Sequence, residues 1–388
     1  MNTQFDHLKT RKLAQAVILS LAALTSSQSH ALNYTATNAT DIIGSTNFFA
    51  VGDINNNGKF WYESSEPPFS NFQWNGTARV QQAELPNAVP DVSGYLSYAS
   101  HMNDLGQVVG ITSVGKDLYH ATRWDNTGVP TELATLGGNY WDEGRAINNQ
   151  GQIAGKAWGT SNYRPVSWNS AGAITDLGTL GGTSGTAEAI NEKGQIVGES
   201  FTTGDDAKHA TLWSNGNIID LGTLGGANST AWGINNLGQI IGTSFLADDV
   251  TQHVTLWNTD GSAPVDLGFD ASLNVGYYLH RIAAINNLGQ IVVAGANGPV
   301  LWENGVSTGI NSLLPPDQQI EVNNETWIHS YAFDINDKGV IGVFGKVGNG
   351  PQSSYILTPN AVPVPGAVWL FGSALEGLIG IKRRKQVA

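Results

Sequence analysis

An all-β fold, a closed ring of seven four-stranded blades, is predicted by three features of the sequence. The first is composition, because 388 residues with 47 glycines and only 13% charged residues suit turn-rich β structure. The second is a phrase, Asn followed three residues later by Gly, that recurs at spacings of 43 to 51 residues. Its seven copies begin at Asn55, Asn103, Asn148, Asn191, Asn235, Asn286 and Asn336. Units of this length are typical of a β-propeller.

The third feature is an aromatic residue that keeps the same register in every copy. Six of the 12 tryptophans occupy this one position, and a tyrosine takes the seventh place. The residues are Trp74, Trp124, Trp168, Trp213, Trp257, Trp302 and Tyr355. One blade cannot bury its own two faces, so a chain that repeats the blade until the ring closes explains the repetition.

Each copy can be divided into four short strands separated by turns. In the fourth copy the strands are the stretch entering Asn191, the run Gly194–Ser200, the segment His209–Trp213 and the segment Ile218–Leu224. The Asn-x-x-Gly phrase joins the first two strands, because Asn favours the first position of a type I turn and Gly accepts a positive φ.

The two ends of the repeat array favour a closed ring over an open β-solenoid, the alternative. The seventh copy stops after "YILTP" without a fourth strand, whereas Thr40–Gly44, "TDIIG", is similar to that missing strand. We therefore expect residues near 38–44 to complete the last blade.

The third strand reads "HATRW", "HATLW" or "HVTLW", and it follows "GQVVG", "GQIVG" or "GQIIG". These phrases resemble the HAF repeat of exported bacterial proteins over most of residues 45–358. The family has no agreed biochemical activity, so the resemblance implies export and a repeat architecture without implying a reaction.

The first 31 residues have the three parts of a secretory signal. Basic residues at positions 9–12 precede an apolar run, Leu13–Leu24, and small residues precede a cleavage point after Ala31. Because about 20 apolar residues are needed to span a bilayer, this run favours a signal peptide over a membrane anchor.

The C-terminal end has a Pro motif, "VPVPG" at 362–366, an apolar stretch through Ile381 and a basic cluster at 382–385. This order resembles the PEP-CTERM sorting signal in its Val-Pro-Leu-Pro-Ala-like variant. The resemblance implies that an apolar helix holds the exported precursor in the inner membrane until an exosortase cleaves near the Pro motif. The residues expected to take part in sorting and processing are Ala31, Pro363, Pro365, Arg383 and Arg384.

Two departures from the sorting signal favour a transient hold over a permanent anchor. Val364 stands where the commonest form has Glu, and Glu376 interrupts the apolar stretch. A carboxylate at membrane depth costs about 2–4 kcal/mol.

The domains we expect are a signal peptide (1–31), the repeat propeller (32–360) and the sorting signal with its transmembrane-like segment (361–388). An ordinary C-terminal helix is the alternative for the last of these.

Charge and cysteine content exclude several classes of function. The whole chain has a net charge of −13. Because the first 31 residues carry +2 and the last 27 carry +3, the body between them carries −18. An acidic body repels nucleic acid and anionic lipid, which makes neutral polymers, cations or proteins the expected partners. Without cysteine there is no disulfide framework, thiolate metal site or thiol nucleophile. We expect neither a cofactor nor a metal.

Three patterns that could carry chemistry are interpreted as structural. The His of the third strand (His120, His209, His253) is replaced by Arg164 and Gly298 in other copies, which a shared catalytic role would not tolerate. The "DINNNG" phrase at 53–58 matches the start of a calcium loop, but Ser64 stands where a bidentate Glu is needed. The phrase "TLGGTSGT" has no following Lys and is expected to be a turn.

The expected ligand-binding residues lie at the end of the ring opposite the tight turns. Strand direction alternates, so the linkers entering each first strand and the loops after each second strand share that end, and they carry the variable sequence. Aromatic rings beside carboxylates and Arg suit sugar rings, although the same rings could pack the linkers instead. The residues are Tyr140, Trp141, Asp142, Glu143, Arg145, Trp158, Tyr163, Tyr277, Tyr278, His280, Trp327 and His329.

Two functions from different classes fit this sequence. The first is an exported, non-catalytic surface or matrix protein that binds exopolysaccharide or another envelope component. The second is a polysaccharide-degrading lyase or hydrolase built on the same scaffold. No catalytic residue group can be identified by spacing, which favours binding.

Overall fold

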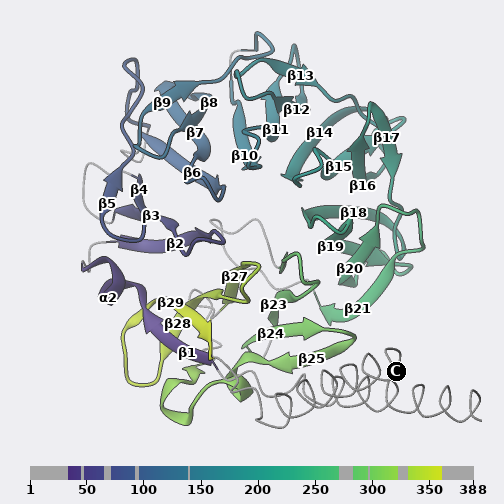
Figure 1. Cartoon of the computed structure of the whole chain (residues 1–388). Coiled ribbons are helices and arrows are strands. Elements are labelled where there is room, and N and C mark those ends of the chain that lie inside the picture. Colours follow the sequence, from purple (N-terminus) through teal and green to yellow (C-terminus); the bar gives the residue numbers. More distant parts are fainter. Residues whose placement is uncertain are drawn as a thin grey trace, which may run out of the picture. The chain divides into compact units, whose positions relative to one another are not determined.

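The computed structural model confirms a seven-bladed β-propeller of four-stranded antiparallel blades (Figure 1). It describes residues 34–44, 48–64, 71–91, 96–138, 140–270, 283–295, 298–321 and 331–360. The propeller forms one compact unit, Thr35–Thr358. The expected signal peptide and sorting signal lie outside the described residues. Among the residues described, no helix is both long and apolar enough to cross a membrane.

Blades one to three are formed by strands that follow one another along the chain. They consist of β2 (Phe48–Ile54), β3 (Phe60–Ser64), β4 (Asn71–Trp74) and β5 (Arg79–Gln81); β6 (Ser97–Met102), β7 (Val108–Gly115), β8 (Leu118–Trp124) and β9 (Pro130–Glu132); and β10 (Glu143–Ile147), β11 (Ile153–Trp158), β12 (Tyr163–Trp168) and β13 (Ile174–Asp176).

Blades four to six repeat this arrangement. They consist of β14 (Gly181–Ile190), β15 (Ile196–Thr202), β16 (Lys208–Ser214) and β17 (Asn217–Asp220); β18 (Gly225–Ile234), β19 (Gln239–Leu246), β20 (Gln252–Asn258) and β21 (Val265–Asp270); and β22 (Ala283–Ile285), β23 (Ile291–Gly295), β24 (Gly298–Glu303) and β25 (Val306–Gly309).

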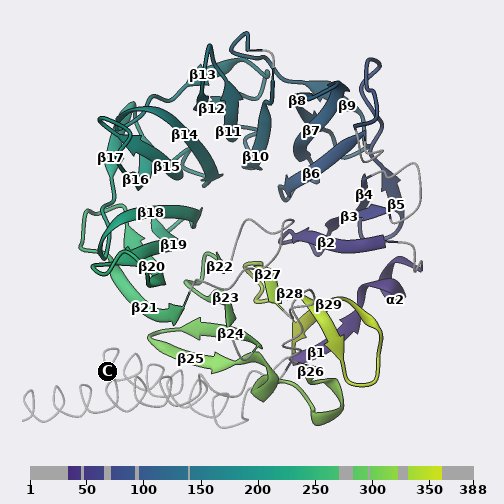
Figure 2. The same ribbon diagram turned by 180° about the vertical axis from the view of Figure 1, so that it is seen from behind.

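Blade seven joins the two ends of the propeller, as Figure 2 shows from behind. Two 3-10 turns, η1 (Ile310–Leu313) and η2 (Pro316–Gln318), lead into it. Its strands are β27 (Tyr331–Ile335), β28 (Ile341–Val347), β29 (Gln352–Pro359) and the N-terminal β1 (Tyr34–Asn38), and the short β26 (Ile320–Glu321) also pairs with β28. An N-terminal strand therefore completes the last blade.

The prediction that residues near 38–44 form this closing strand was wrong. Strand β1 ends at Asn38, and Ala39–Ile43 form a short helix, α2. The local signals favour a helical turn, because the Asn38 side chain accepts a hydrogen bond from the Thr40 N–H at 2.9 Å and Gly44 ends the turn with φ +70°. The similarity of "TDIIG" to a fourth strand was thus misleading.

The "TLGGTSGT" segment was also predicted wrongly. Strand β14 begins at Gly181, so most of this segment is extended rather than a turn. The fourth strand of blade four was expected over Ile218–Leu224, but β17 ends at Asp220. The residues that follow it cross to the next blade. Leu180 and Leu224 each make an isolated bridge to the second strand of the blade they enter.

The Asn-x-x-Gly turns behave as predicted. In blade four the Asn191 Oδ1 accepts from the N–H groups of Lys193 and Gln195, both at 3.0 Å. Gly194 sits at φ +72°, a conformation in which a side chain would be strained. The Asn side chain thus fixes the turn by satisfying backbone groups that the hairpin leaves open.

The same seven asparagines also join the blades in a closed ring of hydrogen bonds. Each Asn Nδ2 donates to the backbone carbonyl of the corresponding Asn in the next blade, at 2.9–3.1 Å. The last bond, from Asn336 to the Asn55 carbonyl, closes the circle across the chain ends. All seven residues are buried. The invariant Asn is therefore needed between blades as well as within the turn.

The tryptophan register forms the core between blades. Trp124, Trp168, Trp213 and Trp257 are at most 4% exposed. The indole N–H of Trp124, Trp168 and Trp213 donates to a carbonyl in the linker from the preceding blade, at 2.7, 2.7 and 3.1 Å. These side chains therefore bury apolar surface and also hold the linkers.

The histidines of the third strand pair with carboxylates of the fourth strand or the residues beside it. His209 Nδ1 lies 2.8 Å from the Asp220 carboxylate, and His120 and His253 pair in the same way with Glu132 and Asp266. Arg164 forms the equivalent ion pair with Asp176 in blade three. The position therefore links the third and fourth strands.

Polar residues line the opening inside the Asn ring in three successive blades. At the position two residues before the Asn, blades seven, one and two have Asp334, Asp53 and His101, whereas the other blades have only Ala or Gly. Asp334 accepts from the Ile54 N–H at 2.9 Å, and Asp53 from the Met102 N–H at 2.8 Å. Asp334 thus fastens blade seven to blade one, where the ring closes, and Asp53 fastens blade one to blade two.

The Asp334 carboxyl should make stability depend on pH. Burial first, then the charge and hydrogen bond of Asp53, raise its pKa well above the ordinary value. Its stabilisation is fully present below the pKa of an unfolded Asp, about 3.9, and is lost as the pH rises through the raised pKa. We expect the free energy of unfolding to fall between pH 4 and pH 8, as measured by urea denaturation.

The Asp334→Asn variant should reduce this pH dependence, because an amide can imitate the protonated carboxyl. The variant should match the wild type at pH 4 and exceed it at pH 8. Asp206→Asn, at an exposed position, is the matched control and should not change the slope. Identical pH profiles for Asp334→Asn and the wild type would contradict the raised pKa of Asp334.

Candidate functional site

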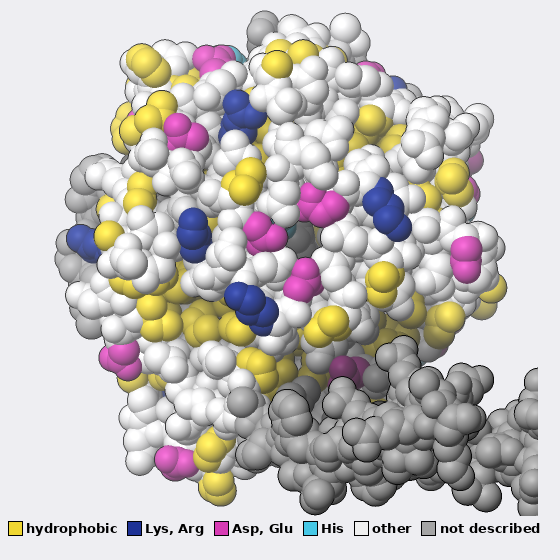
Figure 3. Space-filling view, in the orientation of Figure 1, with side chains coloured by type: hydrophobic (Ala, Val, Ile, Leu, Met, Phe, Trp, Pro, Cys, Tyr) yellow, Lys and Arg dark blue, Asp and Glu magenta, His cyan; other side chains and the backbone are white. Residues whose placement is uncertain are grey.

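The two ends of the propeller differ in character. At the end that carries the Asn turns, acidic side chains gather around the central opening (Figure 3). This opening is small, about 170 Å³, and its side chains are engaged in the rings of hydrogen bonds that join the blades. The opposite end carries the linkers and the loops between second and third strands, and we call it the variable face.

Seven of the twelve predicted binding residues come together on the variable face at blade three. Tyr140, Trp158 and Tyr163 form an aromatic cluster, with ring centroids 4.8–6.3 Å apart. Tyr140 is 42% exposed, so one edge of this cluster is open to solvent. Trp141 lies beside it and packs on Tyr119 of blade two at 4.4 Å.

Asp142 holds the backbone of Trp158, one residue of this aromatic cluster. It is buried, and its carboxylate accepts a hydrogen bond from the Trp158 N–H at 2.7 Å. Burial raises the pKa of Asp142, and the Trp158 hydrogen bond opposes that shift. Asp142 therefore positions Trp158 through its backbone.

Lys156 connects the aromatic cluster with a network of charges. Its ammonium lies 4.5 Å from the centre of the Tyr163 ring and 5.6 Å from that of Trp141, within the range of cation–π attraction. It also lies 3.3 Å from Glu143, and the same carboxylate oxygen is 3.3 Å from Arg145. One carboxylate thus serves two cations.

Arg145 lies between two carboxylates, one from its own blade and one from the next, and its side chain is 12% exposed. Its Nη1 lies 2.6 Å from Glu188, while Nη2 lies 3.3 Å from Glu143. Burial, the largest single influence, lowers the pKa of this guanidinium, but the two carboxylates together outweigh it. The pKa is therefore raised above its usual value, and Arg145 stays charged. Burial also raises the pKa of the nearby Tyr163 to about 12.

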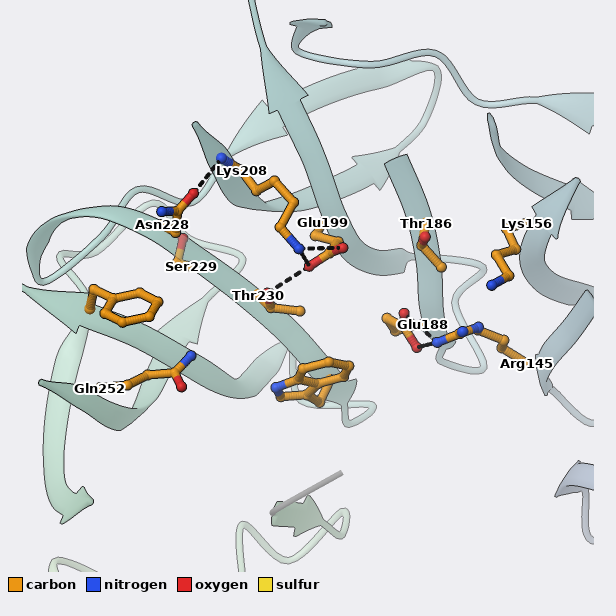
Figure 4. A pocket seen from close by; sticks show the side chains of 12 residues that line it. Arg145, Lys156, Thr186, Glu188, Glu199, Lys208, Asn228, Ser229, Thr230 and Gln252 are labelled. Atoms are coloured by element: carbon orange, nitrogen blue, oxygen red, sulfur yellow. Dashed lines mark hydrogen bonds and ion pairs between the residues drawn. The ribbon is translucent and has the colours of Figure 1, made fainter. Parts of the chain in front are cut away.

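A cavity of about 580 Å³ begins at this network and extends across blades three, four and five (Figure 4). At its far side Lys208 lies 2.9 Å from Glu199, and Glu199 also accepts from the Thr230 hydroxyl at 2.8 Å. The lining residues are Arg145, Lys156, Thr186, Glu188, Glu199, Lys208, Asn228, Ser229, Thr230, Trp232, Phe245 and Gln252. We call it the blade-four cavity.

Most residues of this cavity were missed by sequence analysis, although a signal was present. At the position three residues before the Asn, blades three, four and five have Arg145, Glu188 and Trp232, whereas the other copies have Gly52, Ser100, Ala283 and Phe333. Comparing the copies position by position would have marked the two charged residues and the Trp, although Phe333 shows that size alone does not separate the copies. Lys208 and Glu199 lie on other strands and have no such signal.

The remaining predicted binding residues cannot be placed on this surface. Tyr277, Tyr278, His280, Trp327 and His329 lie outside the described residues. Over the part of the chain that is described, no group of three or more His, Asp or Glu side chains is arranged to hold a metal ion.

Comparison with known proteins supports the fold alone. No protein-family profile matches the chain, and no curated protein matches its sequence. An oligogalacturonate lyase from Vibrio parahaemolyticus is similar in structure, with a TM-score of 0.51 and 13% identity over 86% of this chain and 97% of that one. An oligogalacturonate lyase in complex with manganese has a TM-score of 0.50 and 11% identity, over 85% of this chain and 97% of that one. A putative TolB from Agrobacterium tumefaciens has a TM-score of 0.41 and 13% identity, over 61% of this chain and 88% of that one.

Proposed function

We propose that the chain is an exported surface or matrix protein whose propeller binds exopolysaccharide, or another envelope component, without catalysis. The observation that carries this proposal is the aromatic cluster of Tyr140, Trp158 and Tyr163, which is open on one side and joined through Lys156 to a charged network. Aromatic rings stack on the C–H faces of sugars, while paired charges offer donors and acceptors to hydroxyl groups.

Export and sorting complete this proposal. The N-terminal signal and the C-terminal Pro motif, apolar run and basic cluster support passage across the inner membrane, a transient hold there and processing by an exosortase. The mature protein would then reside at the cell surface or in the extracellular matrix, where exopolysaccharide is available.

The ion pairs in the cavity support binding over hydrolysis. A glycosidase needs one carboxyl group as proton donor and a second as nucleophile or base. In the blade-four cavity both carboxylates are occupied, Glu188 by Arg145 and Glu199 by Lys208 and Thr230. Release of new reducing or unsaturated sugar ends from exopolysaccharide would instead support the degrading enzyme.

Tyr140→Ala should weaken retention on exopolysaccharide about tenfold, which corresponds to about 1.4 kcal/mol. The ring is 42% exposed at the edge of the aromatic cluster, so its loss should leave the thermal midpoint nearly unchanged. Affinity electrophoresis in gels containing the polysaccharide measures the retention. Trp141 is a poorer probe, because it packs on Tyr119 and its loss would also cost stability.

The matched control is Leu237→Ala, since Leu237 is 64% exposed on an Asn turn at the other end of the propeller. It should leave retention unchanged. A Tyr140→Ala variant with unchanged retention and a lowered thermal midpoint would show that the aromatic cluster only packs the linker.

A further inference from the structure

The lining of the blade-four cavity has a positive excess in an acidic protein. Its charged residues are the cations Arg145, Lys156 and Lys208 and the anions Glu188 and Glu199, whereas the whole chain has a net charge of −13. Glu143 reaches Arg145 and Lys156 but does not line the cavity. The local charge therefore differs in sign from that of the whole chain. The acidic charge of the body had led to the expectation of neutral polymers, cations or proteins as partners.

The buried polar atoms left without a partner in the cavity lining are N–H donors. The Arg145 Nε and the Trp232 Nε1 are both buried, and neither has a hydrogen-bond acceptor within the protein. No buried acceptor among the lining residues is left unpaired in the same way. An unpaired buried donor costs about 1–3 kcal/mol. A ligand rich in acceptor oxygens therefore fits this lining better than a ligand rich in N–H or O–H donors.

Lys156 points to the same kind of ligand. It pairs with Glu143, and it shares this carboxylate with Arg145. Burial, which is the largest influence, lowers the pKa of Lys156 despite that partner. A further negative charge beside Lys156 would offset the loss of water around the ammonium.

The walls of the cavity have the shape and surface that a sugar needs. Trp232 and Phe245 supply rings, and Thr186, Asn228 and Gln252 supply polar groups around them. A volume of about 580 Å³ lies within the usual range for small-molecule sites, about 300–1,000 Å³. Figure 4 shows Lys208 and Glu199 on one side of the space, and Arg145, Glu188 and Lys156 on the other.

We propose that the blade-four cavity binds a carboxylate-bearing sugar unit of an acidic polysaccharide. The inference rests on the proposed function, because it names the class of sugar that the variable face recognises. The sugar carboxylate lies between the ammonium groups of Lys156 and Lys208, and the sugar ring packs against Trp232. Arg145 keeps its two carboxylate partners and holds the floor of the cavity.

The test compares two forms of one polymer. The probes are purified exopolysaccharide from the producing cells and the same polymer after chemical reduction of its carboxylates to primary alcohols. Lys208→Gln removes one cation at nearly constant size, and Lys193→Gln, an exposed lysine on an Asn turn, is the matched control. Isothermal titration calorimetry with the purified full-length protein measures each affinity.

We expect the wild type to bind the intact polymer at least tenfold more tightly than the reduced one. Lys208→Gln should lose about tenfold on the intact polymer and nothing on the reduced one, while Lys193→Gln should behave as the wild type. Glu199→Gln should bind the intact polymer more tightly than the wild type, because it removes the anion that competes for Lys208. A lysine with a purely structural role would not produce this gain.

Equal binding of both polymers by the wild type would overturn the inference and leave the proposed function standing. So would equal losses on both polymers for Lys208→Gln. Failure of the wild type to bind either polymer would overturn the proposed function, and the inference with it.

Discussion

Replacing Trp213 with alanine should lower the free energy of unfolding by about 3–5 kcal/mol, the usual cost of truncating a buried aromatic side chain. Trp213 is 4% exposed and packs against Ala154 of blade three and against Ala187 and Ile196 of its own blade. Its indole N–H also donates to the Gly178 carbonyl at 3.1 Å. The variant therefore leaves a cavity between two blades and an unpaired carbonyl in the linker. Urea denaturation followed by circular dichroism measures the loss.

Val250→Ala is the control for this prediction, because Val250 is 79% exposed and its truncation should cost less than about 0.5 kcal/mol. A loss below about 1 kcal/mol for Trp213→Ala would mean that the repeated Trp does not hold the blades together.

Replacing Asn191 with alanine should have an effect of similar size, about 3–5 kcal/mol, because several buried groups lose their partners at about 1–3 kcal/mol each. The Asn191 Oδ1 accepts from two backbone N–H groups of its turn, and its Nδ2 donates to the Asn235 carbonyl in the next blade. One substitution thus weakens a hairpin and opens the ring of seven asparagines. Differential scanning calorimetry should show a lowered midpoint.

Asn217→Ala is the matched control, since Asn217 is exposed in the outer strand β17 and should tolerate alanine with little change. A small effect at Asn191, equal to that at Asn217, would show that packing alone closes the ring.

The architecture could be predicted because one set of local interactions recurs seven times. The Asn-x-x-Gly turn and the repeated Trp each satisfy a requirement that every blade has, so the sequence shows them as a period. The closing strand could not be predicted in the same way. Residues 34–38 are selected by pairing with β29, across the length of the chain. The local signals at Asn38 and Gly44 only determine where the helical turn after that strand begins and ends.

The candidate site was predicted in part for the same reason. The aromatic residues of blade three stand outside the repeated pattern within one short stretch, so their proximity could be inferred. The blade-four cavity combines side chains from three blades, and Lys208 meets Glu199 through the register of β15 and β16. Asp142 was predicted as a binding residue from its neighbours in sequence, whereas its hydrogen bond with the Trp158 N–H depends on how β11 ends beside it.

Hydrogen–deuterium exchange of the purified protein, with and without exopolysaccharide from the producing cells, tests most directly where the propeller binds. Binding at the variable face should slow exchange in segments 140–145, 156–164 and 203–208. The Asn turns at 148–151, 191–194 and 235–238 should exchange as before, because they lie at the other end of the ring. Protection confined to the Asn turns, or no protection at saturating polymer, would contradict glycan binding at the variable face.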